Sequence, residues 1–317
     1  MKKIWCILSI GCMMIFLLAG CGAPQSPDAG GNETQEGRLS VCASFYPMYD
    51  FAVKIGGDKA SVVNMVPAGT EPHDWEPAAS DIVALENADV FVYNGAGMEH
   101  WALEVLDTLQ NEALTVVCAS AGIELLEGHD EHGDEEESEE EEGAEFDPHV
   151  WLDPMYAKRE MENIKNAFVS ADPGNADYYE ANYAEYADAL DALDTEFRDA
   201  LADFSNRDII VAHEAFGYLC AAYGLNQVPI EGLSPDSEPD PAKMAEIIDF
   251  ARDRDIKVIF FEELVSPKVA ETVADAIGAE TDVLNPIEGP GDGDAAEDGD
   301  YFSAMRRNLE SLKIALR

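Results

Sequence analysis

Residues 175–204 decide the fold of the chain; they read NADYYEANYAEYADALDALDTEFRDALADF. No Pro or Gly interrupts it, and its apolar side chains recur every three or four residues, the period of one face of an α-helix. Such a helix rises about 1.5 Å per residue and is on the order of 45 Å long. The apolar positions are Tyr179, Tyr183, Tyr186, Leu190, Leu193, Phe197, Leu201 and Phe204.

Strand-like and helix-like runs alternate on both sides of this stretch. The strand-like runs are residues 39–45, 62–66, 90–94 and 115–119 before it, and 208–212, 227–230, 258–261 and 281–284 after it. The helical patterns are residues 48–55, 80–87, 98–110, 241–254, 267–277 and 301–316. This alternation predicts an α/β fold of two Rossmann-like lobes with mainly parallel sheets.

The long helix is therefore predicted to join the two lobes. We expect an N-terminal lobe at residues 39–170, a rigid linking helix at 171–205 and a C-terminal lobe at 206–317. A coiled-coil partner is the alternative interpretation of the helix. Two adjoining α/β units favour the linking role.

The first residues have the pattern of a secretion signal. Lys2 and Lys3 precede an apolar run, residues 4–19, that is short for a membrane span. The run ends Leu18-Ala19-Gly20-Cys21, the arrangement of a lipoprotein signal in which Cys21 is lipidated. We predict a signal peptide at 1–20, a flexible tether at 21–38, and a protein lipid-anchored outside the cell membrane of a bacterium. An ordinary signal or an anchor helix is the alternative.

Charge limits the possible partners. The chain has 65 acidic and 19 basic residues, a formal net charge of −46. A surface of this kind repels nucleic acid and attracts cations. Residues 130–147 hold 12 acidic residues and no Lys or Arg, which predicts a solvated acidic loop at 129–146.

Cysteine usage argues against a disulfide framework. Beyond Cys21 the cysteines are Cys42, Cys118 and Cys220, an odd number without close spacing. All three lie in apolar stretches, so we expect buried small side chains, with one bridged pair left open.

Three of the six histidines lie in similar short motifs. They are PHDWEP around His73, DPHVWLDP around His149 and VAHEAFGY around His213. Neutral imidazole is the commonest protein ligand for zinc, and three imidazoles with one carboxylate complete a tetrahedral site. The pattern predicts a metal site.

The positions of these histidines place that site. His73 follows the strand at 62–66, His213 ends the strand at 208–212, and His149 comes just before the chain leaves the first lobe. Ligands of open α/β sheets bind beyond the carboxyl ends of the strands, so we predict a site in the cleft between the lobes. Glu288, after the strand at 281–284, is the predicted fourth ligand, and Glu262 and Glu263 compete with it.

Neighbouring residues are expected to support the histidines. A carboxylate that holds the second nitrogen of an imidazole fixes its tautomer, and Asp74 and Asp147 are the candidates. Trp75 and Trp151, each two residues after a histidine, either shield the ion or pack in the core.

The motifs together resemble a known family. GTEPHDWEP (residues 69–77), DPHVWLDP (147–154), HEAFGY (213–218) and the stretch 266–288 are similar to the zinc-binding lipoproteins of ABC importers, the ZnuA/AdcA-like cluster A-I substrate-binding proteins. The resemblance covers about residues 39–317. It implies two α/β lobes joined by one rigid helix, one metal ion between them, a carboxylate ligand at Glu288, and delivery of the ion to a membrane permease.

The expected function is therefore that of a zinc-binding importer component, a monomer that works with an ABC permease and its ATPase and is not an enzyme. Manganese-selective relatives are similar but have a glutamate at the position of His213, whereas three imidazoles suit Zn²⁺. The alternatives are a manganese or iron importer component, a metal-dependent surface adhesin and a secreted zinc hydrolase. No His-Glu-x-x-His motif supports the hydrolase.

Overall fold

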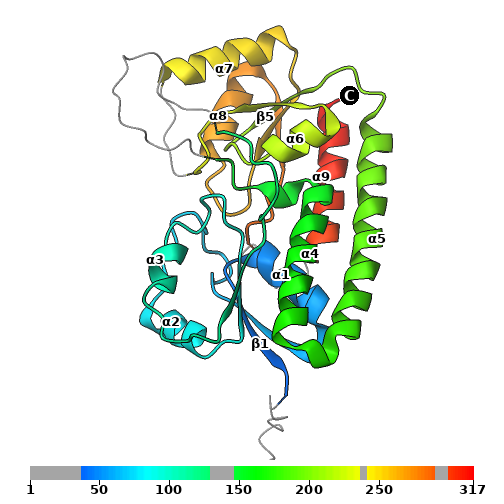
Figure 1. Ribbon diagram of the computed structural model, residues 1–317. Coiled ribbons are helices and arrows are strands. Elements are labelled where there is room, and N and C mark those ends of the chain that lie inside the picture. Colours follow the sequence, from blue (N-terminus) through cyan, green and yellow to red (C-terminus); the bar gives the residue numbers. More distant parts are fainter. Residues whose placement is uncertain (1–36, 129–145, 236–240, 290–298) are drawn as a thin grey trace, which may run out of the picture. The chain divides into compact units, whose positions relative to one another are not determined.

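The computed structural model describes residues 37–128, 146–235, 241–289 and 299–317, and in these ranges it has two four-stranded parallel sheets (Figure 1). The N-terminal sheet has the order β2-β1-β3-β4 and the C-terminal sheet the order β6-β5-β7-β8. The first four strands are β1 (Leu39–Ala43), β2 (Ala60–Asn64), β3 (Val90–Tyr93) and β4 (Thr115–Cys118). The others are β5 (Asp208–Val211), β6 (Asn226–Pro229), β7 (Val258–Phe261) and β8 (Glu280–Val283).

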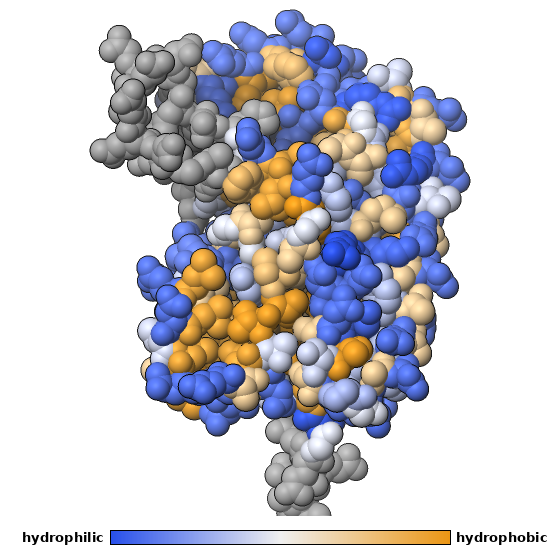
Figure 2. Space-filling model, viewed as in Figure 1, coloured by the Kyte–Doolittle hydropathy of each residue, from blue (hydrophilic) through white to orange (hydrophobic). Residues whose placement is uncertain are grey.

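Helices cover both faces of the N-terminal sheet. α1 (Tyr46–Gly56) and α4 (Pro154–Ala171) pack on one face, and α2 (Ala79–Glu86) and α3 (Ala102–Leu106) on the other. The central strands β1 and β3 are apolar on both sides, as buried parallel strands are: Val41 and Cys42 of β1 face different hydrophobic clusters. Figure 2 shows hydrophobic residues gathered over the α2 and α3 side, where Val83 and Leu103 are exposed.

The C-terminal sheet is covered in the same way. α7 (Pro241–Asp253) and α8 (Lys268–Ile277) pack on one face, while α6 (Gly217–Tyr223) and α9 (Tyr301–Ala315) lie on the other. Ile210 and Ile259 point toward α7 and α8, and Val211 and Phe260 point the other way. Three short 3-10 helices are η1 (Gly57–Lys59), η2 (Val150–Leu152) and η3 (Pro173–Asn175).

The long helix α5 (Ala176–Leu201) joins the two halves. It packs along α4 and also contacts α1, α6 and α9 (Figure 1). Its buried residues Leu190, Leu193 and Phe197 belong to a hydrophobic cluster that includes Val92 of the first sheet and Phe260 of the second. The two sheets therefore share one continuous core along this helix, and the predicted α/β fold is confirmed.

All eight predicted strands form, with ends displaced by at most a few residues. The helix expected at 98–110 is limited to α3, because Thr108 and Asn111 bond to the carbonyl groups of Val105 and Ala88 and the chain turns there. Helices α4 and α6 had not been predicted. α4 begins at Asp153-Pro154, where the Asp153 carboxylate caps the helix by accepting a bond from the amide of Met155, a signal hidden inside the histidine motif.

Several expectations fall on residues outside the described ranges. These are the signal peptide at 1–20, Cys21, most of the tether at 21–38 and nearly all of the acidic loop at 129–146. Within the described part, no helix is long and apolar enough to cross a membrane. Cys42, Cys118 and Cys220, the cysteines of that part, are free thiols, so none of them pairs with another.

Candidate metal centre

The four predicted donors lie together. His73 lies in the loop after β2, and His149 directly precedes η2. His213 lies in the loop after β5, and Glu288 in the loop after β8. One donor atom from each lies within 4.8 Å of the other three. His149, His213 and Glu288 are buried, while the side chain of His73 is 11% exposed. The site is therefore closed except at His73.

The distances between donor atoms match a tetrahedral ion. Nε2 of His149 lies 3.3 Å from Nε2 of His73 and 3.3 Å from Nε2 of His213. Oε1 of Glu288 lies 2.9 Å from Nε2 of His149, 3.4 Å from Nε2 of His73 and 3.6 Å from Nε2 of His213. Bonds of about 2.0–2.1 Å to a tetrahedral ion separate its ligands by about 3.3–3.4 Å, since the edge is about 1.63 times the bond length. Five of the six distances are close to this edge length, and all four donor atoms lie within 4.8 Å of one another, so the cluster has the size of a four-coordinate site for such an ion.

Carboxylates fix two of the three imidazoles from behind. Nδ1 of His149 donates to Oδ1 of Asp147 at 2.7 Å, and Nδ1 of His213 donates to Oε1 of Glu262 at 2.5 Å. Each bond selects the tautomer whose Nε2 lone pair faces the cluster, which is the form that binds a metal. The predicted supporting role of Asp147 is confirmed. Glu262, weighed as a fourth ligand, instead lies behind His213.

His73 is held differently. Its backbone amide donates to Oε1 of Glu71 at 3.1 Å. Asp74, the other predicted support, is exposed, and among the described residues no carboxylate is bonded to Nδ1 of His73. The prediction for Asp74 was therefore wrong, because its side chain points to solvent.

The loop that carries His149 is anchored to the C-terminal half. Oδ1 of Asp147 also accepts the backbone amide of His149 at 2.9 Å, and the hydroxyl of Tyr218 donates to the carbonyl of Asp147 at 2.9 Å. A Cβ atom on Gly217 would lie 2.4 Å from Oδ2 of Asp147, so any larger residue there would displace the Asp147 carboxylate. The sequence signal for this contact was the Gly-Tyr pair that ends the His213 motif, whose role the motif alone did not indicate.

The electrostatics of the cluster favour bound positive charge. Burial alone would lower the pKa of His149, but hydrogen bonds with Asp147 and Glu288 raise it to about 10. The pKa of His213 is also raised, because Glu262 and Glu288 outweigh the effect of burial. Burial raises the pKa of Glu288, yet hydrogen bonds with the imidazoles hold it well below its usual range. Without an ion, protons supply the positive charge that these carboxylates require.

Three buried carboxylate oxygens near the cluster have no hydrogen-bond partner among the described residues: Oε2 of Glu288, Glu262 and Glu71. Burial, and then the charge of Glu288, raise the pKa of Glu71 to about 8. Buried acceptors without donors are costly unless a cation or a proton satisfies them. The surroundings are therefore rich in oxygen atoms suited to a cation.

The two tryptophans have different positions. Trp151 is fully buried, and its ring lies 5.3 Å from that of His149 and 5.1 Å from that of Phe45. Trp75 is partly buried; it packs against Trp101 and contacts both the cluster on the other face of the N-terminal sheet and the main core cluster. Trp151 is therefore a core residue that also covers His149, whereas the ring of Trp75 contacts that of Trp101.

This fold and donor set agree with the family to which the chain belongs. Residues 41–315 match the family described as zinc-uptake complex component A, periplasmic (ZnuA). The match spans most of the chain, so the chain is a member of this family of zinc-uptake components. The resemblance seen in the histidine motifs is confirmed.

Individual relatives are similar over nearly the whole chain. It is 41% identical over 317 residues to the high-affinity zinc uptake system protein ZnuA of Bacillus subtilis, covering 100% of this chain and 99% of that protein. It is 38% identical over 314 residues to the zinc-binding lipoprotein AdcA of Streptococcus pneumoniae, but that alignment covers 99% of this chain and only 61% of AdcA.

Solved structures agree. The Zn(II)-bound ZnuA-like domain of the S. pneumoniae AdcA aligns with a TM-score of 0.76 at 36% identity, over 88% of this chain and 99% of the domain. The laminin-binding protein Lmb of Streptococcus agalactiae, described as bifunctional with adhesin and metal-transporting activity, has a TM-score of 0.77 at 32% identity, over 88% of this chain and 100% of Lmb.

Proposed function

We propose that this chain is the extracytoplasmic substrate-binding component of a zinc ABC importer. It captures Zn²⁺ with His73, His149, His213 and Glu288 and delivers the ion to a membrane permease. The observation that supports this most strongly is the group of three imidazoles and one carboxylate, buried except at His73, whose donor atoms all lie within 4.8 Å of one another. Membership of a zinc-uptake family supports the same conclusion.

The donor set favours zinc over manganese or iron. Three imidazoles and one carboxylate suit a tetrahedral Zn²⁺, whereas Mn²⁺ prefers more oxygen ligands in an octahedral arrangement. Burial of the donors leaves little room for the additional water ligands that an octahedral ion requires. We therefore propose zinc as the cargo rather than manganese.

The same donor set argues against catalysis. Catalytic zinc sites keep one position open for water, with three protein ligands, whereas four protein donors fill a tetrahedron. A closed site suits an ion that is carried and released whole. We therefore propose a binding protein rather than a hydrolase.

The location follows from the first residues of the sequence. Lipidation of Cys21, with residues 21–38 as a tether, would keep the domain at the outer face of the cell membrane, where a permease and its ATPase receive the ion. A Cys21→Ser variant is then expected in the medium or the soluble extracytoplasmic fraction. Fractionation of this variant with membranes, as for the native chain, would contradict the anchor.

Zinc titration tests the site directly. Metal analysis after gel filtration should give about one Zn²⁺ per chain, as one tetrahedral cluster implies. A His73→Ala, His149→Ala, His213→Ala triple variant should lose the tight ion, while the control His100→Ala, whose half-exposed side chain lies outside the cluster, should keep it. Full binding by the triple variant would refute the site.

Growth tests the import role. A strain without this gene should grow poorly when a chelator limits zinc and should recover with added zinc but not with added manganese. The native gene, but not the triple variant, should restore growth. Recovery with manganese alone would favour the manganese alternative.

Adhesion is a second candidate, supported by the similarity to Lmb. If the surface of this chain carries adhesion, the triple variant should still bind immobilised laminin while zinc binding is lost. Absence of binding by the native chain would remove this candidate.

A further inference from the structure

The residue that precedes Glu288 has a strained backbone. Ile287 has φ = 66°, in the left-handed region, and it is buried. A β-branched residue rarely adopts this conformation, and it persists only where surrounding contacts impose it. Because Ile287 adjoins Glu288, its conformation determines where the Glu288 carboxylate lies.

Two asparagines, Asn285 and Asn308, impose this conformation. Oδ1 of Asn285 accepts the amide of Ile287 at 2.6 Å, which closes a tight turn. The buried amide of Asn308, on α9, bonds both sides of Asn285: its Oδ1 accepts the Asn285 amide at 2.9 Å, and its Nδ2 donates to the Asn285 carbonyl at 2.7 Å. Nδ2 of Asn285 donates to Glu263 at 2.6 Å, so the other glutamate once considered as a ligand supports this turn.

A third contact joins the turn to the N-terminal half. Nε1 of Trp151 donates to the carbonyl of Pro286 at 2.7 Å, and both groups are buried. The ring of Trp151 packs against His149, and its carbonyl accepts the hydroxyl of Tyr301 at 2.7 Å. The Trp151 side chain therefore contacts both His149, a donor of the N-terminal half, and the turn that carries Glu288, a donor of the C-terminal half.

We infer that Asn285, Asn308 and Trp151 form a clamp that positions the Glu288 carboxylate as the fourth donor and thereby sets the preference of the site for a small tetrahedral ion. The inference rests on the proposed zinc-binding function. Without the clamp, Ile287 relaxes to negative φ and the carboxylate leaves its place beside Nε2 of His149. Three imidazoles then remain with an open position, and selectivity by geometry weakens.

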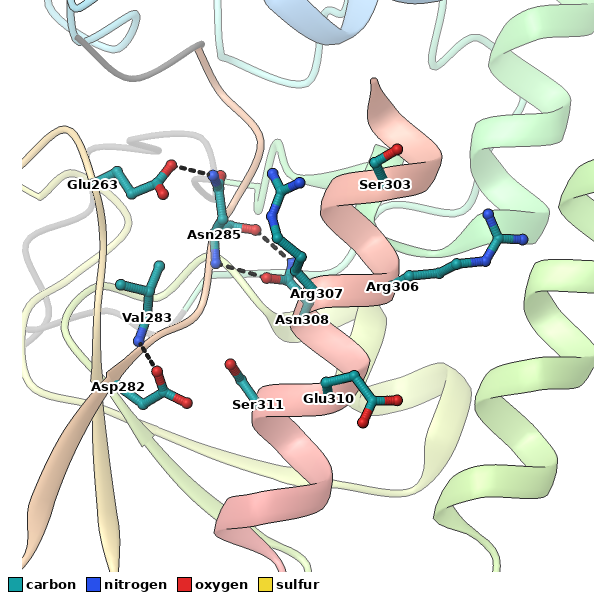
Figure 3. Close-up of a pocket in the computed structure, with 10 residues that line it drawn as sticks. All are labelled: Glu263, Asp282, Val283, Asn285, Ser303, Arg306, Arg307, Asn308, Glu310 and Ser311. Carbon is teal, nitrogen blue, oxygen red and sulfur yellow. Dashed lines mark hydrogen bonds between the residues drawn. The ribbon is translucent and has the colours of Figure 1, made fainter. Parts of the chain in front are cut away.

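The clamp is tested by a double-mutant cycle. Asn308→Ala is expected to weaken zinc binding about 10–100-fold, the usual cost of removing a residue that orients a ligand. In a Glu288→Ala background the same substitution should have no further effect, because the clamp acts only through Glu288. Ser311, on α9, lines the surface pocket that Asn285 and Asn308 also line (Figure 3), so Ser311→Ala is the matched control and should bind zinc as the native chain does.

A second variant keeps the test open if Asn308→Ala does not fold. Trp151→Phe removes the hydrogen bond to the carbonyl of Pro286 and retains an aromatic ring against His149. It should also weaken zinc binding and reduce the preference for Zn²⁺ over Mn²⁺. Competition with a chelator of known affinity measures both. Equal losses with and without Glu288, or native selectivity in the folded variants, would overturn the clamp. If the native chain binds no zinc, the proposed function fails instead.

Discussion

The N-terminal and C-terminal sheets have the same strand order, but they support their metal donors in different ways. In the N-terminal half, His73 and His149 lie on loops after the edge strands, and the carboxylate behind His149 is only two residues away in sequence. In the C-terminal half, His213 follows the inner strand β5, and its carboxylate, Glu262, follows the neighbouring strand β7. The support of His149 by Asp147 is local in sequence. The support of His213 by Glu262 exists only because β5 and β7 pair in the sheet.

This difference has a physical consequence. Donors at the ends of adjacent hydrogen-bonded strands are fixed by the sheet, whereas donors on loops depend on side-chain contacts. The loop of His149 has such contacts, since Asp147 and Tyr218 hold it. His73 has fewer and is the exposed member of the cluster. We therefore expect the donors to contribute unequally.

The largest effect is expected when a buried imidazole is removed. His149 lies between the other two imidazoles and makes the shortest contact to Glu288, so His149→Ala should weaken zinc binding beyond the roughly 10–100-fold that loss of an orienting residue costs. His213→Ala should lower the zinc affinity nearly as much, and His73→Ala should lower it less. Chelator competition provides the three affinities. A greater loss in His73→Ala would break the proposed order, in which the buried donors that are held by more contacts contribute more.

Removal of the carboxylates behind the imidazoles should have the next largest effect. Asp147→Ala and Glu262→Ala should each weaken zinc binding about 10–100-fold. Their effects on stability should differ, because Asp147 accepts two bonds from His149. Glu262 accepts one bond from His213, and its second oxygen has no hydrogen-bond partner in the part of the chain that the structure describes. Each buried donor left unpaired costs about 1–3 kcal/mol.

Denaturant unfolding of the metal-free proteins should therefore show a lower free energy of unfolding for Asp147→Ala than for Glu262→Ala. The control is Glu262→Gln, which keeps an oxygen that can accept from Nδ1 of His213 and should retain most of the affinity. Equal destabilisation by the two alanine variants would mean that local and non-local supports are equivalent.

Local and non-local contacts also separate what the sequence could predict from what it could not. The strands followed from their apolar runs, and Asp147 was recognisable because it stands two residues before His149. The role of Glu262 required knowing that β5 and β7 are neighbours, since 49 residues separate it from His213. The close approach of Gly217 to Asp147 and the left-handed Ile287 are tertiary in the same sense. No periodicity or spacing encodes them.

Proton competition gives the third prediction. Zinc binds neutral imidazole, but in the ion-free protein the pKa of His149 is about 10 and that of His213 is also raised. Zinc must therefore displace protons at neutral pH, and affinity should rise with pH, about tenfold per unit for each proton released. An ordinary imidazole would confine this dependence to the region below about pH 6.5. Calorimetry in buffers of different ionisation enthalpy counts the protons.

The raised pKa of His149 also affects the stability of the ion-free protein, which should fall as pH rises, whereas zinc affinity should increase. A raised pKa contributes stability that is fully present below about pH 6.5 and is lost as pH rises toward 10. Asp147→Asn keeps a hydrogen-bond acceptor but removes the charge, so it should lower the pKa of His149 and flatten the pH dependence of zinc binding. An unchanged profile in Asp147→Asn would show that the local carboxylate does not set this pKa.

The smallest effect is expected from deleting residues 130–142, which lie outside the described part of the chain. Their sequence is acidic and offers no large apolar side chain for a core. The residues on either side, Glu127 and Phe146, form an antiparallel bridge, and the amide of Asp147 donates to the carbonyl of Leu126 at 2.9 Å. The chain ends that flank the deletion are therefore already held together, and a shorter connection lowers the entropy cost of closing the loop only slightly.

The deletion variant should unfold at the same denaturant concentration as the native chain and bind one zinc ion with the same affinity. Loss of the single tight event in calorimetry would show that this segment supplies a primary ligand, and the N-terminal half would then provide more donors than the C-terminal half.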